Sequence, residues 1–129
     1  MTDLDSLGVW VDRYRAAWRS NDPSEIAALF TEDAIYRWNP YGRDEDGAVG
    51  HDAVVASWLE TPEDPNTWEM TCTPLAVNGD LGVVRCMVSY SVSALHPDAA
   101  ETWHNIWLVH LTPDGRCSDF TEHYMKAPG

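Results

Sequence analysis

Basic residues are scarce in this sequence. Lys and Arg together number 8, against 21 Asp and Glu, so the formal net charge is −13. A protein that binds nucleic acid or an anionic membrane needs a patch of basic side chains to neutralise phosphate groups. We therefore expect neither nucleic acid nor a membrane among the partners of this protein.

Cysteines are few, and long apolar runs are missing. Cys72, Cys86 and Cys117 are odd in number and lack CxxC spacing, which argues against a disulfide framework and against a structural zinc site. No apolar stretch approaches the ~20 residues that span a bilayer. The acidic N-terminal segment lacks the basic and apolar parts of a signal peptide. These absences predict a soluble protein of the reducing cytoplasm.

Aromatic residues, in contrast, are abundant. The 129 residues include seven Trp and five Tyr within an ordinary apolar content of 44%. A chain of this length can bury one sizeable core, so residues 1–129 are predicted to form a single domain. So many large rings indicate an interior or an interface that is lined by aromatic side chains.

Apolar spacing predicts three helices in the first sixty residues. Large apolar side chains recur at three- and four-residue intervals over residues 4–20, namely at Leu7, Trp10, Tyr14 and Trp18. Asp22 is a good N-cap and Pro23 suits the first helical position, so a second helix should run from there to about Phe30. A third helix is expected over residues 51–59, with Trp58 on its apolar side.

The remaining segments have the character of strands and turns. A short strand is expected over residues 34–39, and the polar segment 40–50 is interpreted as a solvated lid or rim loop. Later strands are expected over residues 67–77, 81–95 and the two arms of a hairpin over residues 103–124. The hairpin turns at Pro113-Asp114-Gly115, where Pro presets φ and Gly can take a positive φ. Helices followed by an antiparallel meander predict an α+β fold.

Four short motifs carry a resemblance to a known superfamily. They are Arg13-Tyr14-x-Ala16-Ala17, Asn21-Asp22 with the run from Ala28 to Ala34, Val88-Ser89-Tyr90, and Asp114-Gly115-Arg116. With the order of the elements, they make the chain similar to the nuclear transport factor 2-like superfamily. That group includes SnoaL-like polyketide cyclases, ketosteroid isomerases and limonene epoxide hydrolase.

The resemblance implies a cone-shaped roll of three N-terminal helices packed on a curved, mostly antiparallel sheet. Such a cone encloses one deep apolar pocket, and its outer sheet face forms a homodimer. The resemblance also implies the inward positions of the last three strands: Val84, Cys86, Val88, Tyr90, Trp103, Asn105, Trp107, Val109, Leu111, Ser118, Phe120, Glu122 and Tyr124. Without a basic neighbour, Cys86 should then be an inert core thiol.

This chain matches the catalytic residues of the enzymes in this superfamily only in part. Ketosteroid isomerase-like enzymes use a Tyr of the first helix, which Tyr14 matches. Asn39 stands at the position of their general base, and Trp107 stands at the position of a second Asp. Because Asn39 cannot take up a proton, steroid-type isomerisation is not expected.

The similarity to limonene epoxide hydrolase is also incomplete. Tyr36, Asn39 and Glu122 match its polar residues, with Glu122 at the position of a catalytic Asp. Its Arg and its other Asp correspond to Val88 and Tyr90, so water activation by that scheme is not expected.

Glu122 is the main candidate for acid or base catalysis. A carboxyl that faces inward among aromatic rings is desolvated, which raises its pKa toward neutrality. Tyr14 is the second catalytic candidate, since a hydroxyl or amide donor can hold a carbonyl or enolate oxygen. The alternative for Glu122 is that it merely bonds a neighbouring Trp or Tyr or lies at the pocket mouth. The alternative for Tyr14 is an aromatic residue that only packs in the core. Predicted ligand contacts are Trp18, Tyr36, Trp38, Asn39, Trp58, Val88, Tyr90, Asn105, Trp107, Phe120 and Tyr124.

The histidines of the hairpin invite a metal interpretation. The resemblance instead turns His104, His110 and His123 to the outer face, so no metal site is expected. A bulge that turned His104 inward beside Tyr124 would make it a second acid or base candidate.

These residues lead to three functional hypotheses. The first is an enzyme that needs no cofactor and performs acid/base chemistry of the isomerase, cyclase, dehydratase or hydrolase type on an apolar or aromatic substrate. The second is a non-catalytic protein that binds such a molecule. The third is a dimeric interaction module of the same fold. The fold alone selects none of these, because it supports unrelated chemistries.

Overall fold

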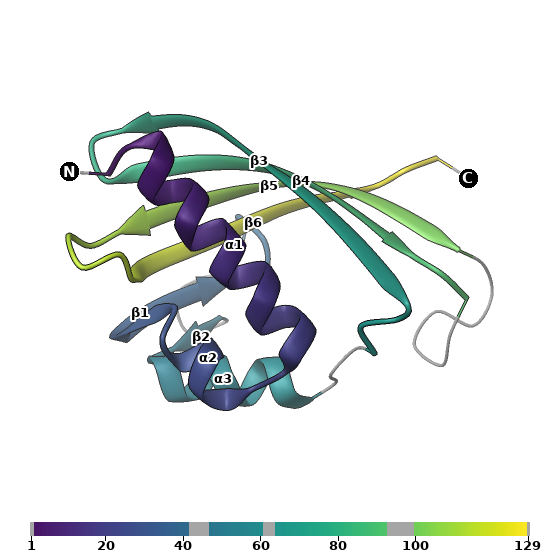
Figure 1. Ribbon diagram of the computed structural model, residues 1–129, viewed down its shortest axis with the longest axis horizontal. Coiled ribbons are helices and arrows are strands. Elements are labelled where there is room, and N and C mark those ends of the chain that lie inside the picture. The colour runs from purple at the N-terminus through teal and green to yellow at the C-terminus, as the bar shows by residue number, and fades with distance from the viewer. Residues whose placement is uncertain (1, 42–46, 61–63, 93–99, 129) are drawn as a thin grey trace.

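The computed structural model describes residues 2–41, 47–60, 64–92 and 100–128. Within these ranges, three helices lie on one side of a curved six-stranded sheet (Figure 1). The helices are α1 (Leu4–Ser20), α2 (Pro23–Ala27) and α3 (His51–Glu60). The strands are β1 (Phe30–Arg37), β2 (Ala48–Val49), β3 (Trp68–Asn78), β4 (Leu81–Tyr90), β5 (Glu101–Leu111) and β6 (Cys117–Lys126). The predicted α+β fold, with helices on a mostly antiparallel sheet, is confirmed.

Helix α1 has the predicted bounds and crosses the concave face of the sheet (Figure 1). It begins with a capping box, in which the Asp3 carboxyl accepts from the Ser6 N–H at 2.8 Å and the Asp3 N–H donates to Ser6 Oγ at 3.0 Å. It ends at Asn21, which takes the left-handed conformation with φ 54°. Its buried side is Leu7, Trp10, Val11, Tyr14 and Ala17. No helix within the described ranges combines the length and the apolar character that crossing a membrane requires.

Helix α2 is shorter than predicted. Asp22 caps it as expected, accepting from the Ser24 N–H at 2.8 Å, but the helix ends at Ala27 and Phe30 already belongs to β1. The cause is a contact with a distant segment, because the Leu29 carbonyl accepts from the Cys117 N–H at 2.7 Å. Strand pairing therefore overrides the helical spacing of these apolar side chains.

Strand β1 lies between β2 and the other four strands of the sheet. It pairs in parallel with β6, and the Arg37 guanidinium donates to the Asp119 carboxylate at 2.6 Å across that pair. On its other side it pairs with β2, so the segment predicted as a loop over residues 40–50 contains a strand. Residues 42–46 of that predicted loop lie outside the described residues.

The other four strands form the predicted antiparallel meander, in the order β6-β5-β4-β3. The tight turns have glycines at positive φ, with Gly79 at 63° between β3 and β4 and Gly115 at 82° between β5 and β6. The hairpin prediction around Gly115 is confirmed. Strand β4 ends at Tyr90 and does not continue through residues 91 and 92, while 93–95 fall outside the described ranges.

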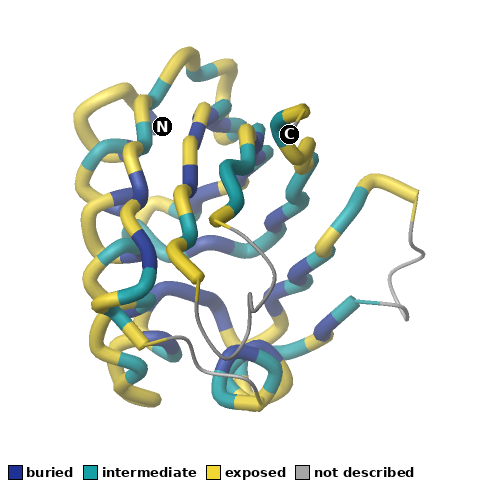
Figure 2. The backbone as a smooth tube through the Cα atoms, turned by 90° about the vertical axis from the view of Figure 1, so that its right-hand side faces the viewer, coloured by how far each residue is buried: buried dark blue, intermediate teal, exposed yellow. Residues whose placement is uncertain are grey.

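Buried and exposed positions alternate along the strands, as Figure 2 shows. The inward positions of β4 and β5 are buried at Val84, Cys86, Val88, Asn105, Trp107, Val109 and Leu111. The expectation for Ser118 was wrong, because a bulge in β6 leaves Cys117 opposite Leu111 and Asp119 opposite His110. Cys117 is therefore the buried residue at this end of β6, and Ser118 is half-buried.

Candidate functional site

Aromatic rings from two helices and three strands meet around Tyr14. The ring of Tyr14 lies 4.4 Å from that of Trp107 and 4.9 Å from that of Trp58, measured between centroids. Phe120 stacks on Tyr36 at 4.4 Å. All five rings are buried, so the fold brings these five predicted site residues into one cluster.

The hydroxyls of Tyr14 and Tyr36 meet inside this cluster. Their oxygens are 3.0 Å apart, and either hydroxyl can be the donor. Burial raises the pKa of Tyr14 and of Tyr36 well above the usual range, so both stay protonated. One proton lies in the shared hydrogen bond, and the other hydroxyl proton can be donated to a third group.

Glu122 faces the same cluster from β6. Strand periodicity places it on the side of Phe120, and the register sets it opposite Trp107 of β5. Its carboxylate accepts a hydrogen bond from Asn105 Nδ2 at 2.8 Å. The residue is half-buried as a whole, but the protein around its carboxyl raises the pKa of Glu122 to about 7. The neighbouring Trp107 indole opposes this shift.

Electrostatic coupling ties the carboxyl to the hydroxyl pair. The charge of Glu122 contributes to the raised pKa of both Tyr14 and Tyr36. A carboxyl with a pKa near 7 can take up or release a proton at neutral pH. The group formed by Glu122, Asn105, Tyr14 and Tyr36 thus combines a proton acceptor with protonated hydroxyl donors in an apolar surround.

Several buried polar atoms near this group lack a hydrogen-bond partner among the described residues. They are the indole nitrogens of Trp18, Trp58, Trp68 and Trp107 and the Asn105 Oδ1. In contrast, the indole N–H of Trp10 donates to the Leu29 carbonyl at 3.0 Å. Buried indoles normally find an acceptor, so these atoms offer contacts to water or to a guest molecule. Sequence reasoning missed Trp68, although period-two counting along β3 gives it the same facing as buried Met70.

Three more of the predicted ligand residues border the cluster. Trp18 stacks on Tyr14 at 6.2 Å and lies 5.1 Å from Trp58. Val88 is buried on β4, and Tyr90 is half-buried against the core.

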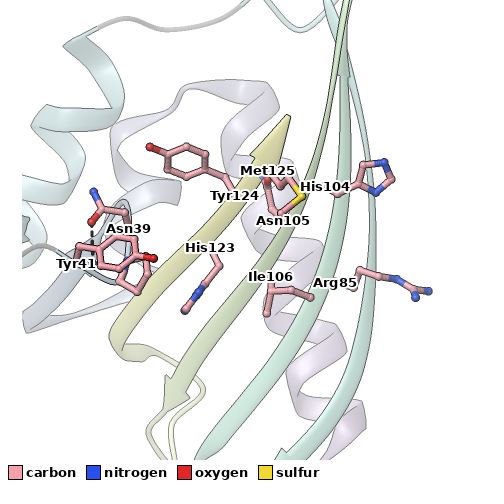
Figure 3. Close-up of a pocket in the computed structure, with 10 residues that line it drawn as sticks. Asn39, Tyr41, Arg85, His104, Asn105, Ile106, His123, Tyr124 and Met125 are labelled. Carbon is pink, nitrogen blue, oxygen red and sulfur yellow. Dashed lines mark hydrogen bonds between the residues drawn. The ribbon is translucent and has the colours of Figure 1, made fainter. Parts of the chain in front are cut away.

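Asn39 and Tyr124 do not join the cluster, and Trp38 only borders it, with its ring 5.8 Å from that of Tyr36. Trp38 is 41% exposed and Tyr124 is 54% exposed. Asn39 accepts the Tyr41 N–H at 2.9 Å in a local turn. Asn39 and Tyr124 instead line a groove of about 840 Å³ on the sheet face opposite α1 (Figure 3). This outer groove is lined by Asn39, Pro40, Tyr41, Arg85, His104, Asn105, Ile106, His123, Tyr124 and Met125.

The histidines follow the facing that the resemblance implied. His104 and His110 are exposed, and His104 and His123 line the outer groove. The suggestion that a bulge turns His104 inward was wrong, because His104 pairs regularly with Met87 and Met125 and the β5–β6 bulge lies at His110. Among the described residues, no three His, Cys, Asp or Glu side chains gather as metal ligands.

Solved structures with the same fold are numerous. TsrD from Streptomyces laurentii is 20% identical, with a TM-score of 0.66 over 96% of this chain and 91% of that one. An LEH-like epoxide hydrolase from M. tuberculosis is 10% identical, with a TM-score of 0.71 over 96% and 86%. A protein of ketosteroid isomerase-like fold from Catenulispora acidiphila, in complex with trimethylamine, is 17% identical, with a TM-score of 0.68 over 89% and 84%. These similarities establish the fold.

Sequence comparison gives the family. No curated protein matches the chain at a significant level. The model of the SnoaL-like domain matches residues 11–120, which span α1 through most of the sheet. This chain therefore belongs to the SnoaL-like family.

Proposed function

We propose that this protein is a cofactor-independent enzyme that binds a small apolar or aromatic molecule against its aromatic cluster and moves a proton with Glu122. The observation that carries the proposal is the Glu122 carboxyl, whose pKa is raised to about 7 beside the Tyr14–Tyr36 hydroxyl pair. Membership of a family with epoxide hydrolase and isomerase-like structural neighbours supports small-molecule chemistry.

The expected chemistry is proton transfer next to an oxygen. Ionised Glu122 takes a proton from carbon or from water, and protonated Glu122 returns it. The free hydroxyl proton of the Tyr14–Tyr36 pair stabilises negative charge on a carbonyl or enolate oxygen of the substrate. Asn105 holds the carboxyl in place through its 2.8 Å hydrogen bond.

The tryptophan side chains of the cluster indicate which class of substrate would bind there. The rings of Trp18, Trp58 and Trp107 pack around Tyr14, and an aromatic lining of this kind suits aromatic or polycyclic guests. Their unpartnered indole N–H groups favour a guest with acceptor oxygens. One structural neighbour is a complex with trimethylamine, which supports small-molecule binding by this fold.

Hydrogen–deuterium exchange tests the proposal, because it detects proton abstraction whatever step follows it. A panel of cyclic and aromatic ketones is first ranked by quenching of tryptophan fluorescence. Binders are then incubated with the protein in D2O, and NMR follows the loss of the protons next to the carbonyl. We expect catalysed exchange that falls at least about 100-fold in Glu122→Gln, with unchanged binding.

The matched control is Glu69→Gln, which removes an exposed carboxyl from β3. Exchange that persists in Glu122→Gln would rule out Glu122 as the proton carrier. Binding without exchange or turnover in the unmodified protein would favour the alternative of a non-catalytic ligand-binding protein.

The proposal includes a homodimer formed through the outer sheet face. The outer groove is bordered by Tyr41, which is 92% exposed, and by Met125, which is 72% exposed. Ile106 of β5 also lines the groove (Figure 3). Large exposed apolar groups around one groove are typical of an interface. Light scattering after size exclusion measures the oligomeric state, and a dimer without ligand binding would favour the interaction module.

A further inference from the structure

Two cysteines that looked unrelated in the sequence face each other across β3 and β4. The Sγ atoms of Cys72 and Cys86 are 2.9 Å apart, and both thiols are free. Non-bonded carbon atoms approach only to about 3.5–4.0 Å. The two sulfurs are therefore within about 1 Å of the bonded distance of about 2.05 Å.

A bulge in β3 creates this arrangement. Near the turn, Asn78 opposes Leu81 and Ala76 opposes Val83, a register that would set Cys72 opposite Met87 if it continued. The register shifts by one residue between Pro74 and Ala76, so Cys72 opposes Cys86. Directly opposed residues on one face have Cα separations of about 4.5–5.5 Å, within the range that disulfides use.

We propose that Cys72 and Cys86 form a reversible disulfide when the protein meets a two-electron oxidant such as a peroxide. This thiol pair goes beyond the proposed acid/base function and does not depend on it. A cross-strand bond at this position closes without moving the strands apart, since the register already aligns the two residues.

The two thiols have different environments. Cys72 is half-buried on β3, which is an edge strand, while Cys86 is fully buried. Burial raises the pKa of Cys86 well above the usual range, and the nearby Arg15 opposes this only weakly. The oxidant therefore reaches Cys72 first, and Cys86 acts as the resolving thiol.

The reaction balances in two steps. The Cys72 sulfur takes one oxygen of hydrogen peroxide, the O–O bond breaks, and a sulfenic acid and one water form. The Cys86 sulfur then displaces that oxygen as a second water, and the S–S bond forms. Two thiols lose two electrons, and the peroxide is reduced to two waters.

Thiol labelling of the whole protein tests the pair. Reduced protein is treated with stoichiometric hydrogen peroxide, quenched with acid, and labelled with N-ethylmaleimide in denaturant. The chain holds three cysteines, so intact mass spectrometry should show three labels before oxidation and one after it. Dithiothreitol should restore all three.

Peptide mapping identifies the partners. Trypsin separates the cysteines into peptides 44–85, 86–116 and 117–126. The proposal requires a link between the first two. The Cys117→Ala variant should still lose two labels on oxidation, whereas Cys72→Ala should keep both of its labels. Linkage in the folded protein should be at least ten times faster than in 8 M urea.

Three results would overturn the proposal. In the first, three labels remain at a peroxide dose that oxidises a free dithiol. In the second, the disulfide involves Cys117. In the third, the disulfide forms as fast in 8 M urea as in the folded protein. The last result would mean that the fold does nothing to promote the bond.

Discussion

At the level of single residues, the Glu122 carboxyl is expected to make the stability of the folded protein depend on pH. Its pKa is raised from 4.5 to about 7, so the folded state holds this proton more tightly than the unfolded state does. The contribution of Glu122 to stability is therefore most favourable below about pH 4.5 and is lost as the pH rises through 7. Above pH 7, the folded protein carries a poorly hydrated charge.

Glu122→Gln should remove that penalty, because a neutral amide resembles the protonated acid. We expect the variant to be more stable than the unmodified protein at pH 8, by at most about 3 kcal/mol. Water that reaches the half-buried residue reduces this figure. The difference should vanish near pH 4.5. Urea denaturation at both pH values measures it, and a difference that does not depend on pH would contradict the raised pKa.

The Tyr14–Tyr36 hydroxyl pair is expected to show coupled stability effects. Tyr14→Phe leaves the Tyr36 hydroxyl buried without its 3.0 Å partner, at a cost of about 1–3 kcal/mol, and Tyr36→Phe does the converse. The double variant leaves neither hydroxyl, so its loss should be about 1 kcal/mol smaller than the sum of the single losses. Denaturation of all four proteins completes the cycle. Strict additivity would show that the hydroxyls do not bond to each other, and exposed Tyr41→Phe is the control.

Only part of the candidate site could be predicted at this scale. Glu122 stood out as an acid within an apolar strand, and the facing of Asn105 and Trp107 came from the resemblance. The contact between Tyr14 and Tyr36 could not be read from the sequence, because α1 and β1 meet only in the folded chain. Cys72 and Cys86 were missed because their alignment depends on a bulge that shifts the register by one residue.

At the level of elements, two glycines where α1 lies against the sheet should respond in opposite ways to substitution by Ala. Gly8 lies inside α1, where an added Cβ would have only Pro74 Cγ nearby, at 4.0 Å. Gly8→Ala should therefore stabilise the protein by up to about 1 kcal/mol through helix propensity. At Gly82 of β4, a Cβ would lie 2.6 Å from Leu7 Cδ1, so Gly82→Ala should cost about 1–3 kcal/mol. Thermal unfolding of the two variants checks both signs, and stabilisation by Gly82→Ala would contradict the close helix–sheet contact.

Elements that depend on local signals were predicted well. The spacing of Leu7, Trp10 and Tyr14 gave α1, and the Pro113-Asp114-Gly115 turn gave the β5–β6 hairpin. The end of α2 was wrong because Leu29 and Phe30 continue its apolar spacing while β6 draws them into strand pairing. Pairing with a segment far along the chain leaves no mark in local spacing.

At the level of the whole molecule, net charge should control the proposed dimer. Each copy carries a formal charge of −13, so two copies repel at low ionic strength. Raising the salt from about 20 to 300 mM shortens the screening length from about 20 Å to less than 10 Å. We expect the dissociation constant of the dimer to fall as salt increases, measured by analytical ultracentrifugation.

A charge on the outer face provides the matched test of this interface. Ile106→Glu places a carboxylate in the outer groove and should give a monomer. Leu75→Glu, at an exposed site on the edge strand β3, should leave the dimer intact. Dissociation in both variants, or in neither, would place the interface elsewhere.

The parallel pairing of β1 with β6 has a consequence for the order of folding. Arg37 and Asp119, which bond across this pair, are 82 positions apart in the chain. The β3–β4 and β5–β6 hairpins close over short loops and can form early, whereas β1 cannot pair with β6 until residues 117–126 have been synthesised. During translation, the aromatic side chains of α1 and β1 are therefore not yet packed against Trp107 and Phe120. We therefore expect the cluster around Glu122 to be completed late in folding, and a nascent chain to expose this apolar surface until then.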